Sequence, residues 1–259
     1  MRTSTPDEIK ATVRQAYGDV ATRKQTGCCG GASCCGTTET SSTQLGYSEE
    51  DLGGVPEGAD LGLGCGNPQA IAALKPGERV LDLGSGAGFD VFLAARQVGP
   101  SGFVIGVDMT PEMVARARTN AAKTGFSHVD FRLGDIEQLP VNDRTVDVII
   151  SNCVINLAPN KEAVFREAYR VLAPGGRLAI SDVVAIGNLP AALAADPAAY
   201  TGCIAGAAPV AELKRTIAAA GFTDVRVAVQ PSSRALMESW SPGTGEVVAS
   251  AVIEAVKPR

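Results

Sequence analysis

The stretch Arg79-Val-Leu-Asp-Leu-Gly-Ser-Gly-Ala-Gly88 decides the fold, because a short apolar run passes directly into a turn that contains three glycines. The apolar run predicts a buried strand over 79–83, and the residues from 89 to 98 predict a helix. Glycines supply backbone angles that other residues avoid, and they let the backbone approach a ligand closely. The stretch therefore predicts a strand–turn–helix unit with a ligand at the carboxyl end of the strand.

The same alternation continues along the chain. Further strands are predicted over 103–107, 129–133, 146–151, 177–181, 225–229 and 247–256, and further helices over 6–20, 111–123, 161–172 and 210–220. Alternation at this spacing predicts an α/β fold, a doubly wound and mostly parallel seven-stranded sheet with helices on both faces. The last strand follows its predecessor without a convincing helix between them, so we expect it to insert antiparallel.

Composition divides the chain into two parts. Residues 26–43 are dominated by Gly, Ser, Thr and Cys, which predicts a mobile loop, and residues 47–71 hold many glycines without a clean period. We expect residues 1–75 to form an N-terminal helix, a Cys-rich loop and a wrapping segment. Residues 76–259 form the main domain in this prediction, with a substrate-covering insertion near 183–209.

Charge and hydropathy exclude several classes of protein. The chain has 259 residues, 45% of them hydrophobic, and a formal net charge of -5, whereas nucleic-acid-binding proteins usually carry a basic face. No apolar run reaches the roughly 18 residues of a membrane helix, and the polar start lacks the apolar core of a secretory signal. We expect a soluble cytoplasmic monomer with no nucleic-acid or membrane partner.

The cysteines need a separate explanation. There are seven, an odd number, and in a reducing cytosol cysteines tend to be buried residues, metal ligands or reactive thiols. The single histidine, His128, leaves almost no material for a histidine zinc site or a Ser-His-Asp triad, and we expect it to be structural or exposed rather than catalytic.

The glycine spacing distinguishes between cofactors. A dinucleotide fingerprint would place its third glycine at position 89, which is Phe89, whereas here it is Gly88. Asp108 ends the second predicted strand, where a carboxylate can accept hydrogen bonds from ribose hydroxyls. With the blocks at 134–140 and 172–178, this pattern resembles the class I, Rossmann-like S-adenosylmethionine methyltransferases. The resemblance implies that S-adenosylmethionine is bound by Asp82, Gly84, Ser85, Gly86, Gly88, Asp108, Met109, Ile136, Glu137 and Asn152.

Single cysteines lie just outside this framework, each in a distinctive block. The blocks are Tyr47-Ser48, residues 62–68 around Cys65, residues 108–113, residues 151–157 around Cys153, and Gly202-Cys203. Together they strongly resemble the arsenite methyltransferase family. The resemblance implies that arsenite is the substrate, that Cys65, Cys153 and Cys203 bind arsenic(III), and that an N-terminal cysteine joins the redox cycle. Four candidates stand there, namely Cys28, Cys29, Cys34 and Cys35.

The chemistry of arsenic agrees with this set of residues. Trivalent arsenic is soft, and soft centres select thiolate ligands. Three thiolates leave its lone pair free to attack a sulfonium methyl, and two thiolates can then return electrons by forming a disulfide. A reducing thiol such as glutathione or thioredoxin would reopen that disulfide by exchange. No general base is needed at arsenic.

Three alternatives remain open at this stage. A class I methyltransferase acting on a small organic or quinone-like acceptor would have the same cofactor motif. A non-enzymatic thiol protein that binds metal on a Rossmann-like scaffold would have the same cysteines. The pairs Cys28-Cys29 and Cys34-Cys35 could form a zinc knuckle, although they are too close together for the common zinc ribbon.

Overall fold

The computed structural model describes residues 5–22, 42–194 and 196–259. The four N-terminal cysteines for which the sequence predicts a redox role, Cys28, Cys29, Cys34 and Cys35, lie outside these ranges. Within them, no helix is both long and apolar enough to cross a bilayer.

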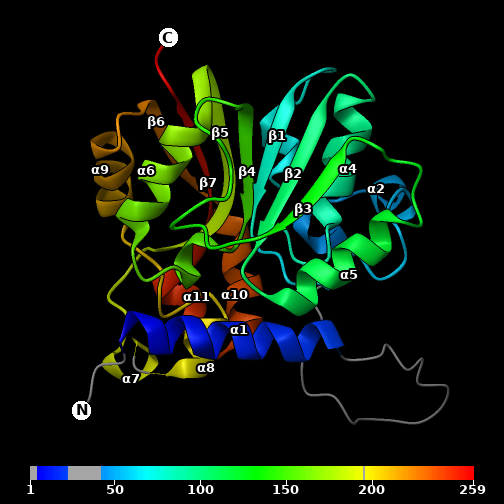
Figure 1. Cartoon of the computed structure of the whole chain (residues 1–259). Helices are drawn as coiled ribbons and strands as arrows, with labels where there is room; N and C mark the ends of the chain where they lie inside the picture. Colours follow the sequence, from blue (N-terminus) through cyan, green and yellow to red (C-terminus); the bar gives the residue numbers. More distant parts are fainter. Residues whose placement is uncertain (1–4, 23–41, 195) are drawn as a thin grey trace, which may run out of the picture.

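A single seven-stranded sheet forms the centre of the molecule (Figure 1). Its strands are β1 (Arg79–Leu83), β2 (Phe103–Asp108), β3 (Val129–Leu133), β4 (Val146–Asn152), β5 (Leu172–Ala185), β6 (Thr223–Val229) and β7 (Val248–Val256). Their order is β3-β2-β1-β4-β5-β7-β6, and β7 pairs antiparallel with both β5 and β6. The predicted α/β fold and the antiparallel last strand are both confirmed.

Helices cover both faces and one end of this sheet. They are α1 (Pro6–Thr22), α2 (Glu49–Gly53), α3 (Gln69–Ala72), α4 (Phe89–Val98), α5 (Pro111–Ala121), α6 (Lys161–Val171), α7 (Ala191–Ala194), α8 (Pro197–Thr201), α9 (Val210–Ala219), α10 (Arg234–Trp240) and α11 (Thr244–Val247), with 3-10 turns η1 (Ser42–Leu45), η2 (Ile155–Leu157) and η3 (Pro231–Ser233). Apart from β5, each predicted strand and helix is present, with ends within two residues of the prediction.

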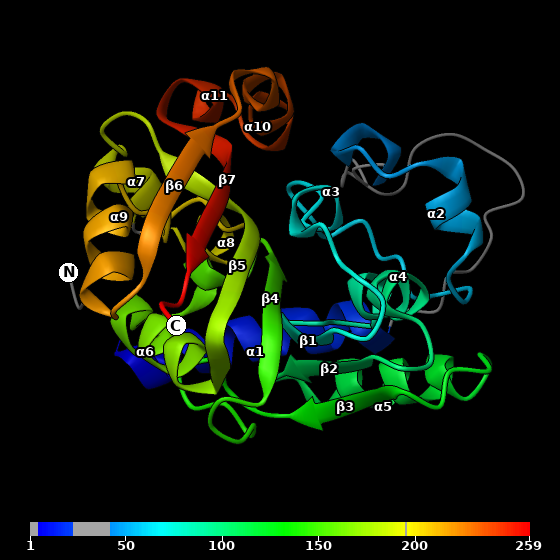
Figure 2. The same cartoon turned by 90° about the horizontal axis from the view of Figure 1, so that it is seen from above.

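Two apolar clusters fill the two faces of the sheet. Residues of α6 and α9 join one cluster with Leu81 and Ile149, while residues of α4 and α5 join the other with Val80 and Val148. Successive side chains of a strand point to opposite faces, so strands this apolar are buried on both sides. Figure 2 shows α6 and α9 side by side next to β6, and the strong twist of the sheet between β3 and β6.

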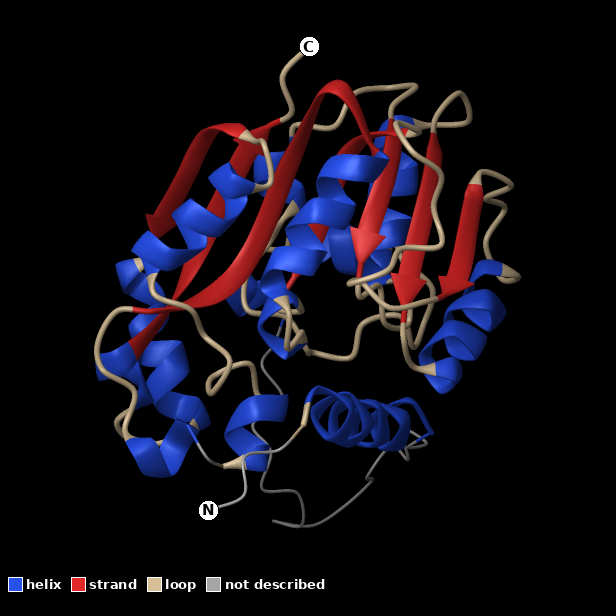
Figure 3. Cartoon of the chain, turned by 60° about the vertical axis from the view of Figure 1, so that its left-hand side comes forward, coloured by secondary structure: helices blue, strands red, loops and turns tan. Residues whose placement is uncertain are grey.

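The predicted strand over 177–181 is too short. β5 starts at Leu172, directly after α6, and runs to Ala185 (Figure 3). The Pro174-Gly175-Gly176 segment lies within β5, where the register against β4 shifts. The shift falls between the pairs Val146–Leu172 and Val148–Arg177. Beyond residue 181 the strand is extended by its pairing with β7, which sequence periodicity does not reveal.

A second correction concerns the connection between β6 and β7. The sequence predicts no helix there, but η3, α10 and α11 fill it. Proline and glycine at 231, 242, 243 and 245 interrupt the helical period in the sequence. Fully buried Met237 nevertheless anchors α10 in a third apolar cluster, which also contains three cysteines.

Helix α1 lies across the carboxyl ends of the parallel strands. Figure 3 shows the arrowheads of these strands pointing toward the helices below the sheet, and Figure 1 shows α1 there beside α8. Residues of α1 contact α5 and α8, which follow β2 and β5 in the chain. The functional edge of the sheet is therefore covered by an element from the start of the chain.

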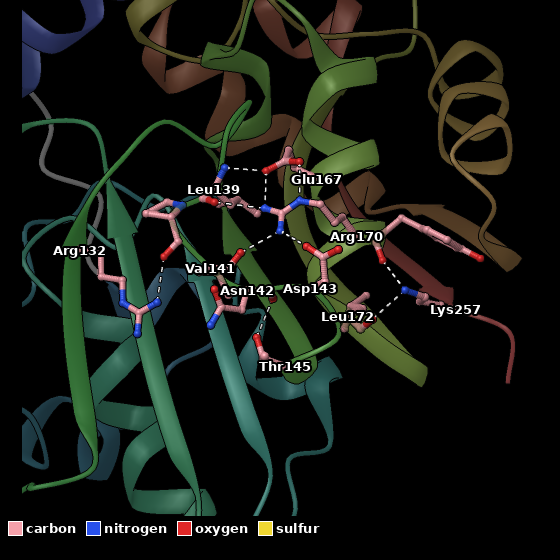
Figure 4. A network of polar contacts seen from close by, with 12 residues as sticks. Arg132, Leu139, Val141, Asn142, Asp143, Thr145, Glu167, Arg170, Leu172 and Lys257 are labelled. Atoms are coloured by element: carbon pink, nitrogen blue, oxygen red, sulfur yellow. Dashed lines mark hydrogen bonds and ion pairs between the residues drawn. The ribbon is translucent and has the colours of Figure 1, made fainter.

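Arg170 of α6 fixes the segment that follows β3 (Figure 4). Its guanidinium donates to Glu167 and Asp143 and to the carbonyl oxygens of Val141 and Leu139. The Arg170 guanidinium holds the pKa of Glu167 below its usual value. Glu167 also accepts from the backbone N–H of Leu139, so both partners bind the same loop. This network holds the segment that carries residues 134–140 at the edge of the cavity described next.

Candidate active site

The glycine turn after β1 has the backbone conformation that its sequence requires. Gly84, Gly86 and Gly88 have φ values of +70°, +51° and +97°, all in the region that favours glycine. The N–H groups of Gly84 and Ser85 donate to the carbonyl oxygen of Val107 at 2.7 and 3.0 Å. The turn is thus tied directly to β2.

The three glycines serve different purposes. A Cβ on Gly84 would lie 2.4 Å from Val154, and a Cβ on Gly88 would lie 2.8 Å from the rings of Phe92 and Phe131. A Cβ on Gly86 would meet nothing closer than 4.0 Å. Gly84 and Gly88 are therefore required by packing inside the protein, while Gly86 borders the open side of the turn.

A cavity of about 1070 Å³, counted to its open mouth, adjoins this turn. Eight of the ten residues predicted to bind the cofactor line it, namely Asp82, Gly84, Ser85, Gly86, Asp108, Met109, Ile136 and Asn152. The other two do not line it. Gly88 is packed between aromatic rings, and Glu137 is engaged by Lys10 and by the N–H of Asn160.

Acidic groups concentrate on one side of this cavity. Asp82, Asp90 and Asp108 all line it, and burial raises the pKa of each, with a further increase at Asp82 from the other two carboxylates. The Asp108 carboxylate accepts from the N–H groups of Gly86 and Thr110 at 2.9 and 2.8 Å. Such a cluster favours a ligand that brings positive charge into the cavity.

Ser85 gives a second indication of a ligand-binding site. Its hydroxyl is buried and, among the described residues, has no hydrogen-bond partner. Buried polar atoms are nearly always paired, so an orphan on a cavity wall indicates a group that a ligand satisfies. S-adenosylmethionine, with its ribose hydroxyls and its cationic sulfonium and ammonium groups, fits these observations.

Helix α1 closes one side of the cavity, which the sequence did not reveal. Lys10, Val13 and Tyr17 line it, and the Lys10 ammonium lies 2.7 Å from Asp135 and 2.6 Å from Glu137. Burial alone would lower the pKa of Lys10, but the two carboxylates outweigh it and the pKa is raised. The apolar face of α1 was readable as a helix pattern, but its target was not.

Three free cysteines meet beside this cavity. Cys65, from the loop before β1, Cys153, directly after β4, and Cys203, after α8, share one buried apolar cluster, and each is at most 4% exposed. The Cys203 thiol donates to the carbonyl oxygen of Cys153 at 2.7 Å. The structure therefore brings together the three thiols that the sequence selected from distant blocks.

Two of these cysteines have an unusual backbone. Cys153 has φ +59° and Cys203 has φ +62°, values that cost free energy for any residue with a Cβ. Such outliers persist where the surrounding structure enforces them, and they concentrate at functional sites. Burial raises the pKa of Cys65, and it raises that of Cys153 well above its usual value, so both are protonated at neutral pH.

Asp182 belongs to the same cluster, although no motif in the sequence pointed to it. The sulfur atoms of Cys65 and Cys153 and a carboxylate oxygen of Asp182 all lie within 4.8 Å of one another. Asp182 accepts from the N–H of Ile155 at 2.9 Å and from the Asn156 side chain at 3.0 Å. Burial raises its pKa to about 6.

Asn152 connects the cofactor cavity with the thiols. Its amide nitrogen donates to the carbonyl oxygen of Gly66 at 2.8 Å and to the Tyr47 hydroxyl at 3.1 Å, and its oxygen accepts from the N–H of Cys65 at 3.1 Å. Tyr47 in turn donates to Asp90 at 2.8 Å. Burial raises the pKa of Asp90 to about 6, against the hydrogen bonds that it accepts from Tyr47 and other donors. Asp90 is a further site residue that motif reading left out, while Tyr47 stood in a recognised block to which the sequence assigned no role.

A second cavity borders two of the three thiols. It is lined by Cys153 and Cys203, by residues of α8 and by Trp240 of α10. Tyr17, Leu63, Gly64 and Cys153 line both cavities, so the two meet at Cys153. Ligands in both cavities would therefore border Cys153.

His128 lies in a different environment. Its ring nitrogen Nε2 is 3.0 Å from the carbonyl oxygen of Ala95, and the side chain is buried against Phe126. These contacts agree with the structural role that the sequence analysis expected.

Comparisons with known proteins agree with this geometry. Residues 74–221 match a family model described as a methyltransferase domain. The chain is 52% identical to an arsenite methyltransferase of Halobacterium salinarum over 98% of its own length and 68% of that protein. It is 45% identical to an arsenite methyltransferase of Aquipseudomonas alcaligenes, over 66% of its own length but only 51% of that relative.

The chain is also similar to a solved structure. The crystal structure of an arsenic(III) S-adenosylmethionine methyltransferase from Chlamydomonas reinhardtii superimposes with a TM-score of 0.63 at 36% identity, covering 82% of this chain and 70% of that one. The glycine turn, the acidic cavity and the thiol cluster thus occur in a chain that is similar, over nearly its whole length, to an arsenite methyltransferase. This chain belongs to the S-adenosylmethionine-dependent arsenite methyltransferase family.

Proposed function

We propose that this chain transfers methyl groups from S-adenosylmethionine to trivalent arsenic, as arsenite or methylarsenite, held by Cys65, Cys153 and Cys203. The observation that carries the proposal is the position of Cys153. It lines both cavities and shares a buried cluster with the other two thiols. Arsenic bound there would lie at the boundary between the cofactor cavity and the second cavity.

The residues of the first cavity hold the cofactor in this proposal. Asp108 and Ser85 offer an acceptor and a hydroxyl to the ribose, and Asp82 and Asp90 offer negative charge to the cationic end. When bound, S-adenosylmethionine supplies an electrophilic methyl group on its sulfonium. The Lys10 ion pairs hold α1 over the cavity and limit the access of water.

The thiols bind arsenic without a net change in protons. Arsenite carries three hydroxyl groups, and exchange with three thiols forms three arsenic–sulfur bonds and three water molecules. Each thiol proton leaves with a hydroxyl, so raised cysteine pKa values do not prevent binding. The resulting pyramid leaves the arsenic lone pair free to form the bond to carbon.

The same sulfurs complete the redox balance. Methylation makes arsenic pentavalent, and two of the three sulfurs then leave as a disulfide, which returns an electron pair to arsenic. A hydroxyl group from water takes the vacated bond and releases a proton, so that methylarsenic stays trivalent on the third sulfur. Exchange with a cysteine among Cys28, Cys29, Cys34 and Cys35, and then with glutathione or thioredoxin, would restore the thiols. Residues 1–75 therefore serve arsenic capture and redox exchange in this proposal, while residues 76–259 bind the cofactor. A reducing cytoplasm suits this cycle, and we expect the chain to act as a monomer.

Separation of arsenic species tests the proposal directly. The protein is incubated with arsenite, S-adenosylmethionine and glutathione, and we expect methylated arsenicals to accumulate. Cys65→Ser and Cys153→Ser should each lower the rate at least about 100-fold, because a lost thiolate removes an arsenic ligand, while cofactor affinity stays within about threefold. Trp240 is the only tryptophan and lines the second cavity, so its fluorescence reports arsenite binding separately.

Two results would contradict the proposal. One is full arsenite methylation by both cysteine variants. The other is methyl transfer to a small organic acceptor by wild-type protein that neither binds nor methylates arsenite.

A further inference from the structure

The buried thiol cluster contains a second ligand set that differs from the proposed arsenic set in one member. Cys65, Cys153 and Asp182 place two sulfurs and one carboxylate oxygen within 4.8 Å of one another. All three side chains are at most 4% exposed. The Cys203 thiol, in contrast, is directed to the carbonyl oxygen of Cys153. Two sulfurs and an oxygen suit a divalent cation of borderline softness rather than arsenic.

The spacing is close to that of a tetrahedral site. Zinc–sulfur bonds of about 2.3 Å and zinc–oxygen bonds of about 2.0–2.2 Å separate tetrahedral ligands by roughly 3.5–3.8 Å. Ligand atoms within 4.8 Å of one another would therefore need to approach by at most about 1.3 Å. Cys153 directly follows β4 in a turn with positive φ, where a small backbone rotation moves its sulfur.

The carboxylate is already oriented for this role. Asp182 is held by the N–H of Ile155 and by the Asn156 side chain, and Asn156 also donates to the carbonyl oxygen of Cys203. Hydrogen bonds of this kind fix a metal ligand in place. The fold thus supplies two sulfurs, an oxygen and a supporting shell before any ion arrives.

Charge balance also favours a divalent ion. Two thiolates and one carboxylate carry three negative charges, and a divalent cation leaves one. Lys161, at the start of α6, is half-buried, and Asp182 is the strongest charge that favours its ammonium form. The remaining negative charge therefore has a neighbouring cation.

We propose that Cys65, Cys153 and Asp182 form a binding site for zinc or a similar divalent cation, which excludes arsenite because both ligands need the same two sulfurs. Binding releases the two thiol protons to solvent, and a water molecule completes the tetrahedron. Only the exclusion of arsenite rests on the proposed function. The binding itself does not.

Cobalt(II), a coloured substitute for zinc, tests the site in the absence of arsenite and cofactor. The full-length chain is used with Cys28, Cys29, Cys34 and Cys35 replaced by Ser, so that these thiols do not contribute. We expect one cobalt per chain, with sulfur-to-cobalt charge transfer and tetrahedral absorption bands, and displacement by zinc. Asp182→Asn should weaken cobalt binding at least about tenfold, whereas Cys203→Ser should change it by less than about threefold.

Arsenite binding, followed by Trp240 fluorescence, should show the opposite pattern. Cys203→Ser should weaken it strongly, and Asp182→Asn should affect it less. In the cobalt experiment, two results would overturn the assignment of the carboxylate. One is an equal loss of cobalt affinity in Asp182→Asn and Cys203→Ser. The other is unchanged cobalt affinity in Asp182→Asn. A wild-type chain that neither methylates nor binds arsenite but still binds cobalt would defeat the proposed function alone.

Thiol protection provides a readout that does not depend on a folded Asp182 variant. With zinc bound, alkylation followed by mass spectrometry should show Cys65 and Cys153 protected and Cys203 no slower to react than in the metal-free protein. Protection of Cys203 together with Cys65 would mean that zinc uses the three-sulfur set, and the carboxylate site would be refuted.

Discussion

The cofactor cavity and the thiol cluster lie next to each other but are built in different ways. The cavity depends on a continuous turn, residues 82–88, whose glycines are fixed by backbone hydrogen bonds and close packing. The thiol cluster joins segments far apart in the chain, and Cys153 and Cys203 alone are 50 residues apart. Its members are held by the half-buried side chain of Asn152 and the buried side chains of Asn156 and Asp182. We therefore expect the first region to be sensitive to added atoms and the second to lost polar partners.

Gly84→Ala should give the largest effect on the first region. The new Cβ would lie 2.4 Å from Val154, and the residue has φ +70°, so both packing and backbone strain oppose it. We expect a loss of about 3 kcal/mol or more in the free energy of unfolding, measured by urea denaturation.

Gly86→Ala is the matched control. It also has positive φ, but its Cβ would meet nothing within 4.0 Å, so we expect a loss of only about 1 kcal/mol. Its main effect should be weaker cofactor binding, because the methyl group borders the cavity. Equal losses of stability in the two variants would mean that contact with Val154 is not what requires glycine at position 84.

Asn152→Ala should destabilise the thiol cluster. The change removes the acceptor for the N–H of Cys65 and the donor to Gly66 and Tyr47, and it leaves buried polar groups unpaired. We expect about 2 kcal/mol of destabilisation and roughly tenfold slower arsenite methylation, since the Cys65 loop loses its anchor. The exposed Asn142→Ala serves as control, with little change expected in either measurement. Normal methylation by Asn152→Ala would show that this anchor does not position Cys65.

The same contrast explains which features the sequence predicted. Strand–helix alternation and the glycine turn are local, so β1, β3 and α4 match the prediction residue for residue. Where pairing is non-local, prediction stopped short, as for β5, whose extension depends on β7. Helix α10 was missed because prolines and glycines hide its period.

The site shows a similar division. Cysteines are rare and stand in distinctive blocks, so their grouping could be inferred from a family resemblance. Asp90 and Asp182 carry no motif of their own, because what makes them unusual is burial and the donors that surround them. Only the folded chain shows that one carboxylate faces the cofactor cavity and the other lies beside the thiols.

These two carboxylates predict a pH dependence of stability. Their pKa values in the folded protein are raised to about 6, above the usual 3.8, so between pH 7 and pH 5 the folded state takes up protons that the unfolded chain does not bind. The free energy of unfolding should therefore rise on acidification through this window, by about 1 kcal/mol for each group. Glu78, Asp147 and Glu167, whose pKa values are lowered, reduce stability only at lower pH.

Urea unfolding of wild type and Asp90→Asn at pH 7 and pH 5 measures this contribution. The variant should lose part of the difference between the two pH values, because Asp182 still titrates, as do Asp82 and Asp108, whose pKa values are also raised. A wild-type protein that becomes less stable between pH 7 and pH 5 would contradict the raised pKa values.

The smallest effect is expected at the border of the two regions, where Lys10 holds α1 over the cofactor cavity. Its ion pairs with Asp135 and Glu137 are partly exposed, so Lys10→Met should cost only about 0.5–1 kcal/mol of stability. Cofactor dissociation, followed by stopped-flow, should nevertheless become about threefold faster, and the difference from wild type should shrink at high salt, because screening weakens the wild-type ion pairs. Arg166→Met, which removes an exposed ion pair with Glu162 on α6, is the control and should leave dissociation unchanged. If both variants release the cofactor at the wild-type rate, the Lys10 ion pairs do not limit its exchange.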